Sequence, residues 1–388
     1  PMRQRQEVQK LPRPHVRRIM KRAILSVTND LYTDARVDKM AMFLTRNGYD
    51  VTLVGRRYAD SPELAPRAYH THRMRLLFRK NWIFYAEYNL RLFFYLLFKK
   101  CDVLIANDLD TLLPNTLVSK FRRKRLVYDS HEYFCGELSV TSNPAALKVW
   151  RAIERFCFPK LKTVITVSQS IVDQYEQEYG MRAHLVRNIP PAGTPPLKCS
   201  KTDLGMPTDK FNLILQGNGL NEGRGGEESV MAMQQLPDAH LFIIGSGTII
   251  PKLRRMVTEL HLGDRITIVP RQTQDMLFQY TALADAGLAM DHDVGPNARF
   301  SLPNKIFEYI KAGTPQIVSN LPERARIVQQ YQVGVVADEI TPEAIVKATR
   351  QLKSNPDFYM QCKENCKKAA QELTWENEEK ILESIYLS

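Results

Sequence analysis

One stretch of the sequence combines residue types that suit the binding of a phosphate. Residues 301–315 read SLPNKIFEYIKAGTP. Ser301 could cap a helix, Pro303 suits its first turn, and Gly313 suits its end. The unpaired backbone amides at such a helix start attract an anion, and the helix dipole adds about 0.3–1 kcal/mol. We therefore expect an anion site at the start of a short helix.

Two charged side chains in this stretch support a more specific expectation. Lys305 is unfavourable at the positive end of a helix unless a phosphate supplies compensating negative charge. Glu308 comes one turn later, and its two oxygens could accept hydrogen bonds from the vicinal hydroxyls of a ribose. The alternative is an ordinary exposed helix that carries a lysine and a glutamate. The residues alone do not decide between the two interpretations.

Short apolar runs form two similar series along the chain and indicate the strands that would position these residues. The runs are rich in β-branched residues and are continuous rather than alternating, as in strands buried on both faces of a parallel sheet. They are 23–28, 51–55, 102–106, 125–129, 163–167 and 184–186 in the first half, and 212–217, 240–245, 265–270, 286–290, 315–319 and 334–337 in the second.

The segments between these runs are long enough for the helices that parallel crossovers require. Residues 38–45 and 227–235 have helical apolar spacing, and 388 residues are too many for one core. We expect an α/β protein with two Rossmann-like, doubly wound domains. Ligands of such sheets bind beyond the carboxyl ends of the strands, so residues just after strands are the candidates.

The proline content marks the boundary between the two domains. Five prolines fall between residues 189 and 210, a composition typical of a linker. We expect a basic leader at 1–20, an N-terminal domain at 21–190, a linker at 191–210, a C-terminal domain at 211–372 and a terminal helix at 373–388.

Residues 301–320 resemble the donor-site signature of the family 4 retaining glycosyltransferases. Those enzymes have the GT-B architecture, in which two Rossmann-like domains face each other across a cleft. Other stretches resemble further elements of the family, and their order and spacing make the match specific. They are 127–132, 164–168, Arg187–Asn188, the glycine-rich loop at 212–225, 240–247, and Trp375–Glu376, which opens what resembles a helix that packs back across the first domain.

The resemblance implies a donor site built mainly from the C-terminal domain. Glu308 matches the second glutamate of the family's Glu-x7-Glu motif, which holds the donor ribose; Phe300 replaces the first, which contacts the transferred sugar. Arg224 matches the basic residue that neutralises the diphosphate, and Lys305 is expected to add positive charge. The implied donor-binding residues are Gly217, Asn218, Gly219, Arg224, Arg271, Ser301, Leu302, Pro303, Asn304, Lys305 and Glu308, and the implied catalytic residues are His131, Arg224 and Lys305.

In the N-terminal domain, the resemblance singles out two places. His131 matches a histidine that approaches the donor sugar and the leaving phosphate across the cleft. Asn29, Asp30 and Arg36 fall in or just after the first strand-to-helix turn, where related enzymes bind the acceptor. A plain surface role is the alternative for Arg36.

No metal and no cofactor are expected. Asp108 and Asp110 have the spacing of the Asp-x-Asp metal motif of the other large glycosyltransferase class. They follow a strand of the first domain, however, far in sequence from the phosphate elements. We expect Asp110 to cap a helix instead.

The function that the resemblance implies is a retaining, metal-independent transfer of a sugar from a nucleotide-diphosphate donor to a glycan or lipid-linked acceptor. A UDP-sugar is favoured, and a GDP-sugar is the other candidate. A nucleotide-sugar epimerase of the same fold remains open and would need acid/base carboxylates around the sugar. A non-enzymatic nucleic-acid-binding protein is the third reading, but no RNA or DNA module is recognisable, so we expect no nucleic-acid partner.

The net charge of +12 is unevenly distributed. Residues 1–100 hold 21 lysines and arginines but only 8 acidic residues. Within them, residues 74–100 place eight aromatic side chains between basic clusters. These aromatics are either the core face of helices or an interfacial surface that meets an anionic membrane. No apolar run is long enough to span a bilayer, and the six cysteines are scattered, so we expect a cytoplasmic protein with reduced thiols. If the aromatics form an interfacial surface, we expect the protein to be peripheral at the inner face of the membrane.

Overall fold

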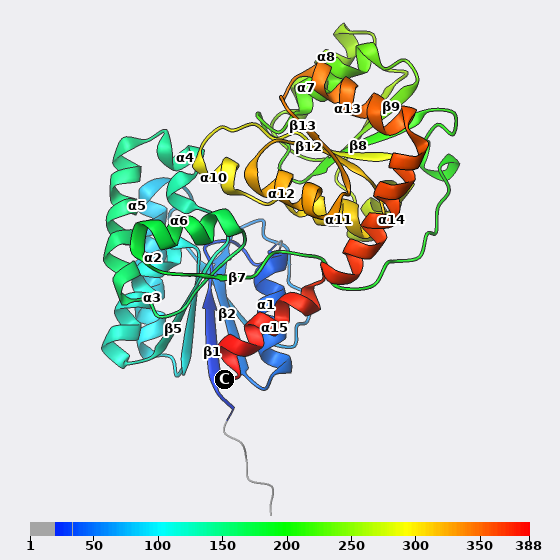
Figure 1. The fold of residues 1–388 in the computed structure, drawn as a ribbon. Helices are drawn as coiled ribbons and strands as arrows, with labels where there is room; N and C mark the ends of the chain where they lie inside the picture. The colour runs from blue at the N-terminus through cyan, green and yellow to red at the C-terminus, as the bar shows by residue number, and fades with distance from the viewer. Residues whose placement is uncertain (1–19, 33) are drawn as a thin grey trace, which may run out of the picture.

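The computed structural model describes residues 20–32 and 34–388, which form two α/β domains (Figure 1). Each domain is built on one sheet of parallel strands with helices packed against it. The expected fold class, two Rossmann-like domains of the α/β type, is confirmed. The predicted basic leader lies outside the described residues, except for Met20.

The N-terminal sheet has seven strands in the order β3-β2-β1-β4-β5-β6-β7, all in parallel pairs. The strand order reverses between β1 and β4, which makes this the topological switch point. All five residues of β4 are buried, as expected for a strand covered on both faces. The strands are β1 (Arg22–Ser26), β2 (Asp50–Arg57), β3 (His70–Arg75), β4 (Val103–Asn107), β5 (Arg125–Ser130), β6 (Val164–Thr166) and β7 (His184–Leu185).

The helices of this domain separate into two groups. α1 packs with α15 against one face of the sheet, while α2, α3 and α5 lie together at the other side. They are α1 (Ala35–Arg46), α2 (Asn81–Phe98), α3 (Leu109–Arg122), α4 (Leu138–Thr141), α5 (Pro144–Cys157) and α6 (Gln169–Tyr179), with short 3-10 turns η1 (Phe134–Gly136) and η2 (Phe158–Lys160). No helix in residues 20–32 and 34–388 is both long and apolar enough to cross a membrane.

The C-terminal sheet repeats the same topology with six parallel strands in the order β10-β9-β8-β11-β12-β13. Its switch point lies between β8 and β11. The strands are β8 (Phe211–Gly217), β9 (Ala239–Gly245), β10 (Ile266–Val269), β11 (Ala286–Ala289), β12 (Gln316–Ser319) and β13 (Gly334–Ala337). The helices and turns are η3 (Thr202–Leu204), α7 (Gly226–Ala232), η4 (Met233–Gln235), α8 (Ile250–Glu259), α9 (Gln274–Leu283), α10 (Pro296–Phe300), α11 (Asn304–Ala312), α12 (Pro322–Tyr331), α13 (Pro342–Ser354) and α14 (Pro356–Glu372).

The chain then returns to the N-terminal domain (Figure 1). α14 packs on the C-terminal domain, and α15 (Trp375–Tyr386) buries Leu382 and Tyr386 in the core around α1. The backbone oxygen of Tyr386 accepts a hydrogen bond from the Tyr49 hydroxyl at 2.7 Å. The Arg187 guanidinium also pairs with Glu378 at 2.6 Å. The first domain is therefore assembled from both ends of the described chain.

Candidate active site

A cavity of about 400 Å³ lies between the domains, where the carboxyl ends of strands from both sheets meet. The N-terminal domain lines it with His131 and with residues that follow it up to Leu138. The C-terminal domain lines it with residues 221–224, Asp291 and residues 301–304. Of the residues predicted to be catalytic, His131 and Arg224 are brought together here, and Lys305 follows the lining segment directly.

Three cations surround one buried carboxylate on the C-terminal wall of this cavity. Asp291, just after β11, accepts a hydrogen bond from Arg224 Nη1 at 3.1 Å and faces Arg324 Nε at 3.3 Å. Burial alone would raise the pKa of Asp291, but Lys305, Arg324 and Arg224 hold this pKa at about 2. Three positive charges against one negative charge leave a surplus that suits a diphosphate.

These cations differ in their freedom to move. The Arg224 side chain is 43% exposed, so it can turn from Asp291 toward a ligand. Arg324 is completely buried and donates to the Ala298 carbonyl oxygen and the Ser301 hydroxyl, both at 3.1 Å. Arg324 therefore fixes the loop before α11. The sequence analysis did not identify Arg324. The only signal for it was its position in the first turn of α12, the helix that follows β12.

One detail of the predicted donor site is wrong, and another stays a prediction. Ser301 does not cap α11, because the helix starts after Pro303 and the Ser301 hydroxyl donates to the Ala298 carbonyl oxygen at 3.0 Å. Gly217, Asn218 and Gly219 are not among the residues that line the cavity. They lie at the end of β8 and in the bend that follows, ahead of the lining residues 221–224, and their contact with a donor stays a prediction.

Glu308 lines a second cavity of about 460 Å³, and Asn304 lines both this cavity and the first. The Glu308 carboxylate accepts a hydrogen bond from Gln216 Nε2 at 2.6 Å, and Thr281 in turn donates to Gln216 at 2.7 Å. Burial raises the pKa of Glu308, while Gln216, Lys305 and Lys39 oppose this rise. The other oxygen of this carboxylate can accept hydrogen bonds from a diol in the cavity.

Other residues complete this second cavity. Lys39 of α1 and Asn188 line it from the N-terminal side, and Gln274 and Phe278 of α9 line it from the C-terminal side. Arg271, predicted to approach the base, is exposed after β10 and is not among the lining residues. Its contact with a donor stays a prediction.

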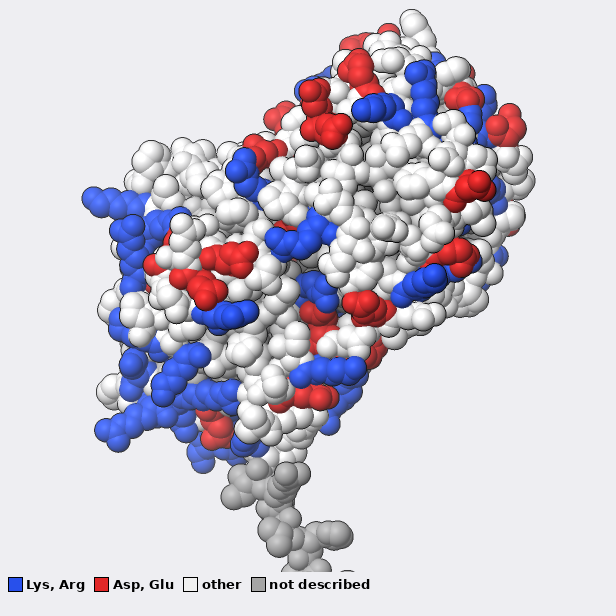
Figure 2. All heavy atoms as spheres, viewed as in Figure 1, with Lys and Arg blue, Asp and Glu red and all other residues white. Residues whose placement is uncertain are grey.

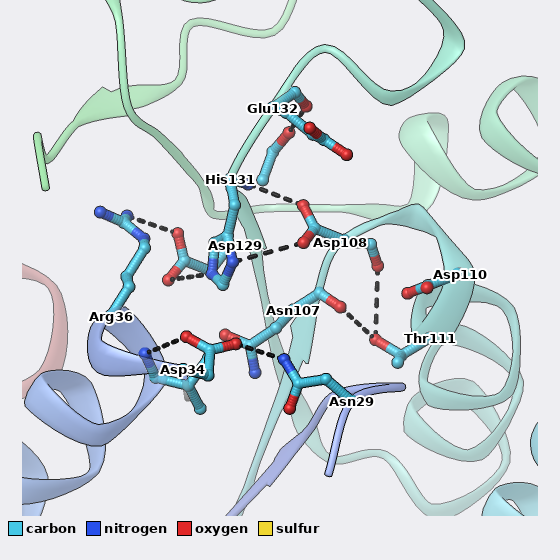
Figure 3. A network of polar contacts seen from close by, with 12 residues as sticks. Asn29, Asp34, Arg36, Asn107, Asp108, Asp110, Thr111, Asp129, His131 and Glu132 are labelled. Atoms are coloured by element: carbon cyan, nitrogen blue, oxygen red, sulfur yellow. Dashed lines mark hydrogen bonds and ion pairs between the residues drawn. The ribbon is translucent and has the colours of Figure 1, made fainter. Parts of the chain in front are cut away.

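His131 sits between two aspartates in the N-terminal wall (Figure 3). Its ring nitrogens lie 3.3 Å from Asp108 and 3.4 Å from Asp129, and its backbone amide donates to Asp108 at 2.8 Å. Burial alone would lower the pKa of His131, but Asp108 and Asp129 raise this pKa to about 9. His131 is therefore an imidazolium at neutral pH, a fixed positive charge across the cavity from Arg224.

The prediction that Arg36 contacts the acceptor is wrong. Its side chain is buried and donates to Asp129 at 2.7 Å and to the Val186 carbonyl oxygen at 2.8 Å (Figure 3). Arg36 instead neutralises Asp129 and thereby positions His131. Asn29 and Asp30 bond within their own turn, where they accept hydrogen bonds from the Leu31 and Tyr32 amides. Their contact with an acceptor stays a prediction.

The Asp-x-Asp pair also has a different role from the one expected. Asp110 does not cap α3; Asp108 occupies that position, with a φ of 61°, and turns its carboxylate toward His131. Burial and Asp108 raise the pKa of Asp110 to about 7, and Thr28 donates to it at 2.6 Å. No group of three or more His, Cys, Asp or Glu within the described ranges is placed to hold a metal ion.

Contacts across the cavity hold the two domains together. Asn297 of α10 accepts a hydrogen bond from the Tyr133 amide at 2.8 Å and donates to Glu132 and Glu137. Phe300, which replaces the first glutamate of the family motif, packs on the Tyr133 ring at 5.6 Å between centroids. Glu132 and Glu137 of the N-terminal domain thus approach the part of the cavity wall where the family's first glutamate is replaced by Phe300.

The two halves of the chain match separate family models. The model described as Glycosyltransferase Family 4 matches residues 35–192, and the model described as Glycosyl transferases group 1 matches residues 206–369. The chain belongs to family 4 of the glycosyltransferases. The predicted family and its GT-B architecture are confirmed.

Individual proteins agree with this family 4 assignment at the level of fold. A sucrose-phosphate synthase from Thermosynechococcus elongatus is 18% identical with a TM-score of 0.76, over 94% of this chain and 98% of its own. HepE of Anabaena, solved in complex with UDP-glucose, is 15% identical with a TM-score of 0.72, over 95% of this chain and all of its own. An uncharacterized glycosyltransferase of Haemophilus influenzae is 27% identical over 129 residues, about a third of either chain.

Proposed function

We propose that this protein is a retaining glycosyltransferase that takes its sugar from a nucleotide-diphosphate donor. The observation that carries the proposal is that two cavities adjoin Asn304, the first residue of α11. One holds the surplus positive charge around Asp291, and the other holds the Glu308 carboxylate. A UDP-sugar is the favoured donor, and HepE, with a similar fold, binds UDP-glucose; a GDP-sugar is the other candidate.

In the proposed reaction the acceptor oxygen forms a bond to the anomeric carbon while the bond from that carbon to the phosphate oxygen breaks. The acceptor attacks from the face that the diphosphate leaves, and a departing phosphate oxygen takes its proton. Arg224, Lys305 and the imidazolium of His131 stabilise the charge that develops on the leaving group. The enclosing domains exclude water. Because these cations already compensate the diphosphate, we propose that the reaction needs neither a metal ion nor a cofactor.

The test is the binding of UDP to the protein with Glu308→Gln, measured by calorimetry with and without EDTA. Loss of a charged acceptor for the ribose diol should cost about 1.5–3 kcal/mol of binding free energy. Glu259→Gln, on the exposed face of α8 in the same domain, is the control and should bind UDP like the unmodified protein. Equal UDP affinity in the folded Glu308 variant contradicts the assignment of this cavity.

The acceptor is proposed to be a glycan or a lipid-linked saccharide at the inner face of an anionic membrane. α2 buries Phe84, Tyr88, Leu92 and Leu96, so the core interpretation of the aromatic segment applies to this face, and the membrane interpretation stays a proposal for the rest. The other face of α2 is exposed: Trp82 near its start is 73% exposed and Phe98 at its end is 79% exposed, and Phe121 near the end of α3 is also 79% exposed. Lysines and arginines gather on the same side of the domain (Figure 2).

Paired carboxyls in the cavity favour a second candidate, a nucleotide-sugar epimerase. Glu132 and Glu137 both approach Asn297, and burial together with the charges of Asp108 and Glu137 raises the pKa of Glu132. One protonated and one ionised carboxyl could act as acid and base on the sugar. Incubation with UDP-sugars in the absence of an acceptor separates the candidates, because only an epimerase converts the sugar of the intact donor.

A further inference from the structure

A third, smaller cavity lies away from the interdomain site, at the open edge of the N-terminal sheet. Its volume is about 380 Å³, and its lining includes Arg56 and Arg57 from the end of β2 and Arg75 and Arg79 from the end of β3 and the loop after it. Arg57 and Arg75 are direct partners in the register of the two strands. Like charges placed opposite each other on neighbouring strands are destabilising unless an anion lies between them.

The protein itself supplies little negative charge to this cavity. Arg57 pairs with Glu63 at 2.5 Å, but the Glu63 side chain is 82% exposed. Among the described residues, neither Arg75 nor Arg79 has an ion-pair partner. The charges of Asp30 and Asp110 also act on Arg56.

Arg56 is held ready for a ligand by its aromatic neighbours. Its guanidinium lies 4.2 Å from the Tyr58 ring centroid and 4.3 Å from that of Phe84. Its Nε is buried and has no hydrogen-bond partner. A buried donor of this kind normally finds an acceptor, and a phosphate oxygen is a suitable one.

The surroundings of the cavity indicate what carries the anion. The Arg56 amide donates to the Asn29 carbonyl oxygen at 2.8 Å, so the cavity adjoins the turn predicted to bind the acceptor. On its outer side the exposed apolar residues Leu77, Phe78 and Trp82 lead onto the face of α2. A ligand with an anionic head and an apolar chain fits both environments.

We propose that this arginine cavity binds a phosphate or diphosphate group, carried by the lipid to which the acceptor saccharide is attached. The inference rests on the proposed function and extends it to the chemical class of the acceptor. The cavity would hold the anionic linkage at the sheet edge while the apolar chain lies along α2. The saccharide end would then be directed past Asn29 toward the interdomain cavity.

The test is a calorimetric titration with farnesyl diphosphate of the double variant Arg75→Gln with Arg79→Gln. Loss of two charge-assisted contacts should weaken binding by at least about tenfold. The control is Lys120→Gln with Arg155→Gln, which removes the same charge from exposed positions on α3 and α5 outside the cavity. The control should bind farnesyl diphosphate like the unmodified protein.

Further arms separate the sources of the phosphate. If inorganic diphosphate binds more weakly than farnesyl diphosphate, the phosphate group is carried by a lipid. If both ligands bind equally and the cavity variant loses both, the phosphate site exists but its ligand is soluble. Equal affinity of both double variants for farnesyl diphosphate overturns the proposal. A defect of the cavity variant that appears only on phosphatidylglycerol vesicles overturns it too. UDP binding is measured in parallel. If the unmodified protein does not bind UDP, that result contradicts the proposed function but not the phosphate site in the arginine cavity.

Discussion

At the scale of single residues, charge around His131 decides what this side chain can do. Asp108 and Asp129 face its ring, and Arg36 neutralises Asp129 from behind. An imidazolium held in this way cannot act as a general base at neutral pH. It can act as a fixed cation and hydrogen-bond donor toward a phosphate, which is the task that the proposed mechanism assigns to it.

This charge state predicts a pH dependence of stability. The pKa of His131 is about 9 in the folded protein, above its ordinary value of 6.5. The charged form therefore stabilises the fold fully below pH 6.5, and this contribution is lost as the pH rises through 9. We expect the difference in unfolding free energy between the protein and His131→Gln to shrink by about 2–3 kcal/mol from pH 6 to pH 10. Urea denaturation measures it, and a pH-independent difference would contradict the charge assignment.

Arg36 gives a second prediction at this scale. Arg36→Met keeps the aliphatic stem but leaves Asp129 buried without its cation, so the unfolding free energy should fall by about 3–5 kcal/mol. Arg46→Met on the same helix is the control. Arg46 pairs with Glu379 at the surface, with its side chain 57% exposed, so its loss should cost less than about 1 kcal/mol. Similar losses in both variants would show that the buried pair has no special role.

How far these residues could be predicted depends on the range of the interactions. Glu308 and Lys305 belong to one continuous motif, and the cavities contain or adjoin both. Arg36 was placed wrongly because its partner Asp129 is 93 positions away, and a local motif does not show which buried acid an arginine will meet. Arg324 was missed for the same reason, since it acts through Asp291, on another strand end.

At the scale of secondary-structure elements, the strands that could be predicted from the sequence are those that are buried in the sheets. Each of the twelve predicted strands corresponds to an observed one, because buried parallel strands are continuously apolar. β3 was not predicted, since it is a polar edge strand in which only Met74 is buried. The start of α11 was also misjudged: Pro303, without a side-chain cap, precedes the helix, and Ser301 belongs to the end of α10.

One helix is capped from the opposite domain, which leads to a prediction about closure. Glu323 at the start of α12 accepts hydrogen bonds from the Ser170 amide at 2.8 Å and the Ser170 hydroxyl at 2.6 Å, at the start of α6. Losing such a cap costs about 0.5–2 kcal/mol, and here the loss falls on the closed arrangement of the domains. Glu323→Ala should therefore open the protein, which small-angle scattering detects as a larger radius of gyration without ligand.

The same variant should lower turnover while UDP affinity stays nearly unchanged, because Glu323 lines neither cavity of the proposed donor site. Asp357→Ala, which removes an exposed acid from the first turn of α14, is the control. An unchanged radius of gyration for Glu323→Ala would mean that this contact does not hold the domains closed.

At the scale of the whole molecule, the outer face of the N-terminal domain predicts membrane binding. Each cation near an anionic surface contributes about 1 kcal/mol, and each aromatic side chain that leaves water adds about 1.5–3 kcal/mol. Phe94→Ser with Phe98→Ser should weaken sedimentation with phosphatidylglycerol liposomes by at least about tenfold. Leu197→Ser with Met360→Ser removes comparable exposed apolar groups elsewhere and is the control. Neutral liposomes should bind the protein weakly, and equal binding of all variants would contradict this surface.

The return of α15 to the N-terminal domain has a consequence for biosynthesis. Leu382, Ile385 and Tyr386 complete the apolar core around α1, so this core stays uncovered until they have left the ribosome. After the N-terminal domain, the ribosome must make the roughly 190 residues of the linker and the C-terminal domain before it reaches the end of α15. This takes on the order of 10–40 s at translation rates of about 5–20 residues per second. The C-terminal core draws on no strand of the other domain and is complete once Leu373 has been made, shortly before Leu382. The second half of this chain would then mature before the first, against the direction of synthesis, and the nascent N-terminal half is the part that chaperones would need to protect.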